Sequence, residues 1–354
     1  MLPSPPKGWS LASGAARRRR RRRIRLACTV AVVVLIAVIA VWLVGRSGGD
    51  HRAVNAGSRG RTGTTTGPTT TVAPHLAVEV LATALPTALS RSSVVTKDGS
   101  AFVIGGLGPG GSTTQVLRFD PSTSALAPAG RLAAAVHDAA ASVVGPNMVV
   151  FGGGDETHTV ATVQTVVPGA TGRLLAKLPT ARSDLVTGDV GGRTYVLAGF
   201  DGTKSPTAVL ETTDGVTYSE VAQLPDPVRY PAVAVVGSVI YLFGGQVGNT
   251  QTADVQAVDV TARTARVVAK LPMALSEATA WVQRGAVYLA GGRQATAVSD
   301  AIRRVDVATG QVATVGTLPA PTADAPVAVV DDTAFLFGGE GSGRLRSIVK
   351  ISLG

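Results

Sequence analysis

Cysteine, histidine and aromatic residues are all scarce in this sequence of 354 residues, which has one cysteine, four histidines and 4% aromatics. The single cysteine, Cys28, excludes an intrachain disulfide, a cysteine-rich zinc site and a redox-active thiol pair. A lone cysteine fits an exported protein that is stabilised by its core alone. We therefore expect neither a disulfide framework nor a bound metal.

Acidic residues are absent from residues 1–25, which hold nine basic residues. The formal net charge of the whole chain is +10, yet residues 76–354 hold 20 basic and 22 acidic residues and are close to neutral. A DNA-binding domain carries its basic patch on the folded part of the chain. The charge distribution therefore argues against a nucleic-acid partner.

Charge is also absent from residues 26–44, an apolar run that follows seven consecutive arginines and Ile24-Arg25. A helix of this length spans about 30 Å, the thickness of a bilayer's hydrocarbon core. The run is long for a cleaved signal peptide and no small-x-small cleavage site follows it, so we favour an uncleaved signal anchor. The arginines predict a single-pass protein of the cell membrane, with residues 1–25 in the cytoplasm and the remainder outside.

Residues 45–75 contain mostly Gly, Thr, Pro and Ser, which is typical of a disordered, flexible linker. Its expected root-mean-square reach is about 30 Å. The sequence therefore predicts a folded part, residues 76–354, that is tethered to the outer surface of a membrane.

The folded part contains an internal repeat with a period of 46–47 residues. Strand-like segments such as IYLFGG (240–245) end in a glycine pair, or in Ala-Gly once. A second landmark, a leucine that usually precedes proline, recurs with the same spacing. The first positions of the pairs are Gly105, Gly152, Ala198, Gly244, Gly291 and Gly338, and the marker leucines are Leu85, Leu132, Leu178, Leu224, Leu271 and Leu318. A fixed period in this range indicates a propeller or a solenoid.

Each repeat reads as four short antiparallel strands, and no helical period occurs after residue 76. Six such units predict an all-β, six-bladed β-propeller preceded by a single transmembrane helix. The segment 347–354 supplies only the third strand of the last blade. We expect residues 76–85 to pair with residues 347–353 and complete that blade, because closing the ring removes two open sheet edges.

Residues 76–354 resemble the kelch family of β-propellers. The resemblance rests on the six glycine-pair strand ends and on an aspartate in the turn after the third strand (Asp120, Asp214, Asp259 and Asp306). It implies that the glycine pair lies where neighbouring blades approach closely. Kelch repeats usually carry a tryptophan a few residues after that turn, whereas here Tyr218 is the only aromatic near the position.

Catalytic constellations are not evident. Galactose oxidase, a kelch copper enzyme, needs a Cys–Tyr crosslink, which the position of Cys28 in the apolar run excludes. The segment 212–218 only faintly resembles a sialidase Asp-box. We therefore favour a membrane-tethered extracytoplasmic propeller that binds a protein or a polysaccharide. We expect it to be monomeric and to need no cofactor. The alternative is a metal-independent carbohydrate-active enzyme, such as a sugar isomerase or mutarotase.

The candidate site follows from the repeat, because equivalent positions of a propeller meet around its axis. Six residues beyond each marker leucine lie the residues that we call the axial ring: Arg91, Asp138, Asp184, Tyr230, Glu277 and Asp324. His137 and Arg229 precede two of them. Loops after the glycine pairs are expected on the same face and add Asp155, Glu156, His158, Asp201, Lys204 and Arg293. The alternative is a solvated ring of charges that only satisfies the strand ends.

Overall fold

The computed structural model describes residues 76–295 and 297–354. The described residues belong to one compact unit, which is built from strands and turns. No helix in these two ranges is long and apolar enough to cross a membrane. The basic tail, the predicted membrane span at 26–44 and the linker lie outside the described residues.

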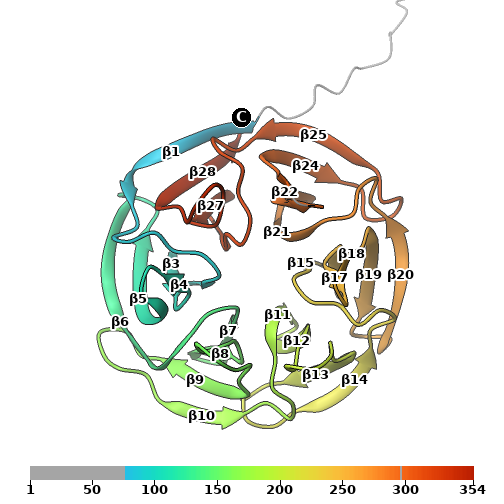
Figure 1. The fold of residues 1–354 in the computed structure, drawn as a ribbon, viewed down its shortest axis with the longest axis horizontal. Helices are drawn as coiled ribbons and strands as arrows, with labels where there is room; N and C mark the ends of the chain where they lie inside the picture. The colour runs from blue at the N-terminus through green and yellow to red at the C-terminus, as the bar shows by residue number, and fades with distance from the viewer. Residues whose placement is uncertain (1–75, 296) are drawn as a thin grey trace, which may run out of the picture. The chain divides into compact units, whose positions relative to one another are not determined.

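Six β-sheets are arranged around a central axis like the blades of a propeller (Figure 1). In each blade the first strand lies nearest the axis and the fourth strand forms the outer rim. The strands of blades one to three are β2 (Ser93–Lys97), β3 (Ser100–Ile104), β5 (Gly111–Asp120) and β6 (Ala125–Val136); β7 (Ala140–Val144), β8 (Asn147–Phe151), β9 (Thr162–Val166) and β10 (Leu174–Lys177); and β11 (Ser183–Val190), β12 (Arg193–Phe200), β13 (Ala208–Thr212) and β14 (Ser219–Gln223).

The remaining blades repeat the arrangement, and three loops after the glycine pairs add short extra strands. The strands of blades four to six are β15 (Ala232–Val236), β16 (Val239–Phe243), β19 (Asp254–Asp259) and β20 (Thr264–Lys270); β21 (Ser276–Gln283), β22 (Ala286–Gln294), β24 (Ala301–Val305) and β25 (Val312–Thr317); and β26 (Val327–Val330), β27 (Thr333–Phe337), β28 (Ser347–Leu353) and β1 (Leu76–Ala84). The extra strands are β4 (Leu107–Gly108), β17 (Gln246–Val247), β18 (Thr250–Gln251) and β23 (Ala297–Val298).

Blade six is completed by both ends of the described chain, as the sequence predicts. Strand β1 pairs antiparallel with β28, from Leu76 opposite Leu353 to Ala84 opposite Ser347. The N–H of Leu85 then donates to the carbonyl oxygen of Arg346 (2.8 Å). This pairing joins the first and last repeats, so the ring has no open end between them.

The hydrophobic core lies between neighbouring blades. Side chains of a strand alternate in direction, so β3 gives Val103 to the cluster shared with blade six and Ile104 to the cluster shared with blade two. In the first of these clusters the ring centroid of Phe119 lies 5.1 Å from that of Phe335. The marker leucines are all buried, at 0–5% exposure. The repeated leucine therefore anchors the segment that enters each blade.

The glycine pairs lie where one blade meets the segment that enters the next. In five blades the first position is glycine with φ between 59° and 66°, and an added Cβ would lie 2.0–2.7 Å from a carbonyl oxygen of that segment. The N–H of the second glycine donates to the same oxygen, as Gly292 does to Thr322 (2.9 Å). Blade three has Ala198 at the first position with φ 59°. The close approach expected from the sequence is confirmed.

Aspartates close the turns between third and fourth strands. Asp259 Oδ1 accepts hydrogen bonds from the N–H groups of Thr261 and Ala262 (3.0 and 2.9 Å). Asp306 closes the corresponding turn of blade five in the same way. These turns lie at the ends of the strands opposite to the glycine pairs, which leaves the glycine-pair face to the loops of the candidate site.

Candidate functional site

The axial ring is a closed circle of backbone hydrogen bonds. Each ring residue donates its N–H to the carbonyl oxygen of the ring residue in the preceding blade, at 2.9–3.1 Å; Arg91 completes the circle by donating to Asp324. All six residues have φ between 51° and 59° although none is glycine. Left-handed backbone costs a residue with a Cβ about 1–2 kcal/mol. The hydrogen bonds fix this conformation and gather the six side chains at the axis.

The four ring carboxylates are buried rather than solvated. The side chains of Asp138, Asp184, Glu277 and Asp324 are 4–8% exposed. Arg91 connects two of them, with Nη1 at 3.1 Å from Asp138 Oδ2 and Nε at 3.6 Å from Asp324 Oδ2. This placement does not fit a ring of charges that only meets solvent.

A second ionic group adjoins the ring on the side of blades five and six. Arg293 pairs with Glu277 and lies 3.4 Å from Glu340. Glu340 also accepts a hydrogen bond from the Ser90 hydroxyl (2.8 Å) and lies 3.4 Å from Arg91. Glu340 is absent from the residues that the sequence singles out. Its position one residue after Gly338-Gly339, like that of Arg293 after Gly291-Gly292, is the signal that could have found it.

On the side of blades three and four, an arginine lies between aromatic rings. The guanidinium of Arg229 is 5.0 Å from the ring centroid of Phe200 and 5.5 Å from that of Tyr230. Its Nη1 is 3.9 Å from Asp184 Oδ2. The backbones of Arg229 and Gln246 exchange two hydrogen bonds of 3.0 and 2.8 Å, which hold the arginine at the edge of the ring.

Burial and mutual repulsion alter the acidity of the ring. Burial, followed by the charge of Asp138, raises the pKa of Asp184 to about 7 although Arg229 opposes the change. Burial also raises the pKa of Asp324 and of Asp138, against the opposing charge of Arg91. Burial and the nearby carboxylates raise the pKa of the Tyr230 phenol. Asp184 is therefore partly protonated near neutral pH, so this carboxyl group can donate as well as accept hydrogen bonds.

The axis is hollow at the ring and among the innermost strands that follow it. A cavity of about 160 Å³ is lined by the six ring residues and the residues that follow them. A second cavity of about 330 Å³ lies among the small side chains of the innermost strands. Ala139, Pro231 and Ala278 line both cavities. The polar ring is thus the mouth of an axial channel whose inner wall presents both apolar side chains and polar groups.

His137 and the loops of blade two form a separate group beside the ring. His137 Nδ1 lies 2.8 Å from the Ser112 hydroxyl, and its Nε2 lies 3.7 Å from Asp138. Glu156 accepts a hydrogen bond from the backbone N–H of Ser112. The side chain of His158 is 79% exposed and does not reach the ring residues by any hydrogen bond or ion pair among the described contacts.

Two of the expected loop residues support their own loops. Asp155 Oδ1 accepts backbone N–H groups of Thr157 and His158 (both 2.7 Å). Asp201 Oδ1 accepts those of Thr203 and Lys204 (both 2.8 Å). These bonds lower the pKa of both aspartates. Of the six expected loop residues, Arg293 joins the ionic groups at the ring, and Lys204 lines a cleft next to Arg229.

Metal binding has no support in the described ranges, where no group of three or more histidine, cysteine, aspartate or glutamate side chains could hold an ion. The ring carboxylates are instead paired with arginines. The arrangement can offer both hydrogen-bond donors and hydrogen-bond acceptors, charged and neutral, to a polar molecule at the channel mouth.

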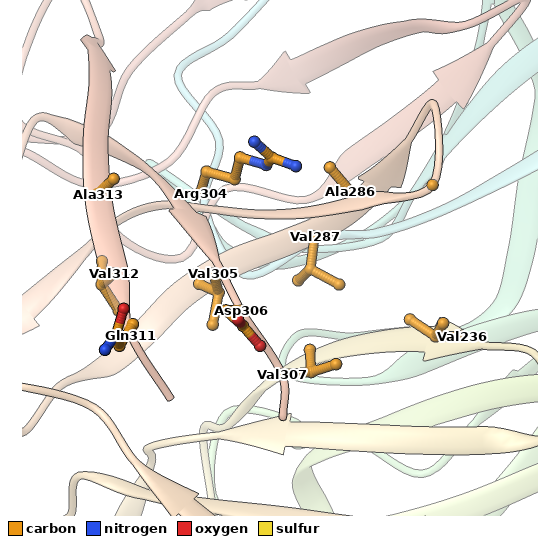
Figure 2. A pocket seen from close by; sticks show the side chains of 11 residues that line it. Val236, Ala286, Val287, Arg304, Val305, Asp306, Val307, Gln311, Val312 and Ala313 are labelled. Carbon is orange, nitrogen blue, oxygen red and sulfur yellow. The ribbon is translucent and has the colours of Figure 1, made fainter. Parts of the chain in front are cut away.

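A different cavity, of about 460 Å³, lies between blades four and five near the turns of the opposite face. Figure 2 shows valine side chains of both blades around it, including Val236 and Val305, with Arg304 and Asp306 among them. Val312, which also lines it, stands six residues before Leu318, as Tyr218 stands six residues before Leu224. The cavity therefore occurs where the resemblance would place a large aromatic side chain.

Comparisons with known proteins agree with the repeat. The family described as "Kelch motif" matches residues 227–271, which run from the segment that enters blade four through the strands of that blade. A solved structure titled "Structure of YjhT" aligns with a TM-score of 0.64 and 15% sequence identity, over 76% of this chain and 95% of that chain. At this identity the similarity concerns the fold alone. No curated protein sequence matches significantly.

Six sheets around one axis, glycine pairs at the contacts between blades and a kelch motif in blade four all describe one architecture. The chain is a six-bladed β-propeller that contains a kelch motif at residues 227–271.

Proposed function

We propose that this propeller is a binding module that recognises a hydroxyl-rich ligand, such as a polysaccharide, at the mouth of its axial channel. The observation that carries the proposal is the axial ring, where an arginine and a tyrosine separate two pairs of buried carboxylates on a rigid backbone circle. Sugar hydroxyls donate and accept hydrogen bonds, so they match a surface that offers both in fixed positions. A binding role also fits a kelch-type propeller, which suggests a scaffold for interaction.

Preorganisation supports binding over a purely structural role for these side chains. The backbone circle closes without using any ring side chain. Arg91 and Arg293 hold the carboxylates in place through ion pairs, so little conformational entropy remains to be lost when a ligand arrives. The ring could therefore bind a polar group with few adjustments.

The test uses residues 76–354, which contain every strand of the six blades and belong to one compact unit with its own core. Binding to polysaccharides is screened, and dissociation constants are measured by calorimetry. We expect Asp324→Asn and Glu277→Gln each to weaken binding about tenfold, which corresponds to the loss of one hydrogen bond. The melting temperature should change little, because the backbone circle is kept.

The matched control is Asp98→Asn. Asp98 also has positive φ (50°), but its side chain is 86% exposed in a turn at the other end of the strands. It should leave binding unchanged. The proposal fails if the ring variants bind the polysaccharide like the wild type, or if a protein partner binds the same face and no glycan does.

A second candidate, a metal-independent sugar isomerase or mutarotase, is favoured by one observation. Asp184 has a pKa of about 7 and lies near Asp138 and Tyr230, and a carboxyl group with such a pKa suits general acid–base catalysis at neutral pH. Exchange between the anomers of a bound sugar, followed by NMR, tests this role. Catalysis should be lost in Asp184→Asn and kept in Asp98→Asn; exchange at the uncatalysed rate in the wild type contradicts it.

We also propose that residues 26–44 anchor the propeller in a membrane with residues 45–354 on the extracytoplasmic side. The apolar run and the preceding arginines support this orientation. A reporter fused after Gly354 should be active only if it works in an exported compartment. Activity of a cytoplasmic reporter at that position would contradict the orientation.

A further inference from the structure

A cleft of about 490 Å³ opens between blades three and four, beside the axial ring. Its walls come from the loop after the glycine pair of blade three, the segment that enters blade four and the turn between β17 and β18. The lining residues are Phe200, Thr203, Lys204, Ser205, Pro227, Arg229, Gly248 and Asn249. The cleft is larger than the cavity of about 160 Å³ at the ring, and Arg229 is adjacent in sequence to the ring residue Tyr230.

The charge of this cleft is positive. Lys204 and Arg229 line it, and none of its lining residues is acidic. Asp201, in the same loop, directs Oδ1 at the backbone N–H groups of Thr203 and Lys204. The only ion pair of Arg229 within the described residues is the long one to Asp184, at 3.9 Å. The two cations are therefore incompletely neutralised by the protein.

Arg229 is held as a fixed donor. Its guanidinium lies over the rings of Phe200 and Tyr230, and its backbone is bonded to Gln246. Its Nε is buried without a hydrogen-bond partner in the structure. A planar guanidinium with such restricted motion is suited to an anion with two or three oxygens, which accepts its N–H groups together.

We infer that this cleft binds an anionic substituent, a carboxylate or a phosphate, carried by the sugar ligand whose neutral part occupies the axial ring. The inference rests on the proposed function and specifies its substrate class as acidic glycans. Arg229 binds the anion, Lys204 adds the second positive charge, and the hydroxyls of Thr203 and Ser205 are available to the remaining oxygens.

The experiment compares three probes that differ in one substituent: glucose, glucuronate and glucose 6-phosphate. Binding to the 76–354 protein is measured by NMR titration at low and at high salt. We expect the anionic sugars to bind at least about tenfold more tightly than glucose. The carboxylate and phosphate arms show which anion the cleft prefers. Equal binding of the neutral and anionic sugars overturns the inference.

Variants locate the anion. Arg229→Gln and Lys204→Gln should each reduce the affinity for the anionic sugars several-fold, and Lys204→Gln should leave that for glucose unchanged. Lys204 is exposed, so its variant keeps the fold even if Arg229→Gln does not. Arg263→Gln, an exposed cation in the turn between β19 and β20, controls for general electrostatics. An equal loss in Arg263→Gln and Lys204→Gln also overturns the inference.

The same measurements separate this inference from the proposed function. If Asp324→Asn abolishes sugar binding while Arg229→Gln and Lys204→Gln change nothing, the ring function stands and the anionic cleft is refuted. If inorganic phosphate alone binds in a manner that depends on Arg229, while Asp324→Asn affects no probe, the cleft is an anion site and the ring function is refuted.

Discussion

Replacing Gly291 by alanine tests why the repeat needs its glycine pairs. At Gly291 the backbone has φ +66°, and an added Cβ would lie 2.0 Å from the carbonyl oxygen of Thr322. That oxygen accepts the N–H of Gly292 at 2.9 Å. The left-handed conformation costs alanine about 1 kcal/mol, and separating the blades leaves a buried N–H and C=O poorly paired at about 1–3 kcal/mol each. We expect Gly291→Ala to lower the free energy of unfolding by about 4 kcal/mol.

The control variant separates backbone strain from close approach. Gly285 has a similar φ of +73°, but no heavy atom lies within 4 Å of an added Cβ. Gly285→Ala should therefore lose only about 1 kcal/mol. Urea unfolding of the 76–354 protein can be followed by the fluorescence of Trp281, the only tryptophan in that range, which is 3% exposed. If the two variants lose the same stability, close contact between blades does not explain the glycine pair.

Three further predictions concern cavity filling, protonation and ring closure. Val312→Tyr should raise the free energy of unfolding by about 1 kcal/mol, measured by urea unfolding, because a ring would occupy part of the cavity in Figure 2; a loss of stability would show that the cavity cannot accept it. Asp184 has a pKa of about 7 in the folded protein, whereas its pKa in the unfolded chain is near 4. This group therefore lowers the free energy of unfolding as the pH rises from about 4 to about 7, and its contribution is constant above that range. Asp184→Asn should make the slope of the unfolding free energy against pH shallower by up to one proton, and an unchanged slope would contradict the assignment. Removing residues 76–84 should leave one edge of β28 unpaired and cause aggregation, measured by light scattering; a monomeric, cooperatively folded product would refute the closure argument.

The sequence was sufficient to predict the fold and the meeting of the ring residues, for a geometric reason. In a closed propeller, residues at equal offsets within successive repeats lie at equal distances from the axis. The marker leucines therefore located Arg91 and Asp324, which are distant in sequence, in one circle. Strand closure followed from the missing fourth strand of the last repeat.

Side-chain partners could not be predicted in the same way, because the period fixes backbone positions and not the reach of long side chains. Glu340 contacts Arg91, Arg293 and Arg344 from a loop position at which other blades have Leu107 or Gly154. Only the lengths and rotamers of these side chains decide which pairs form. The cavity beside Val312 could not be predicted from the sequence either. The absence of an aromatic residue at this position does not show whether neighbouring side chains will fill the space.

The identity of the ring residues is more informative than their position. The backbone circle requires only an N–H and a carbonyl from each of them, and all six have positive φ, for which glycine, asparagine or aspartate would be the least strained choices. Three of the six are instead Arg91, Tyr230 and Glu277. Closing the backbone circle alone would cost less strain with glycine, asparagine or aspartate at these positions. The strained residues that are present therefore point to a use for their side chains. Because Arg91 orients two carboxylates and Tyr230 packs against Arg229, the strain is retained where the proposed ligand would be held.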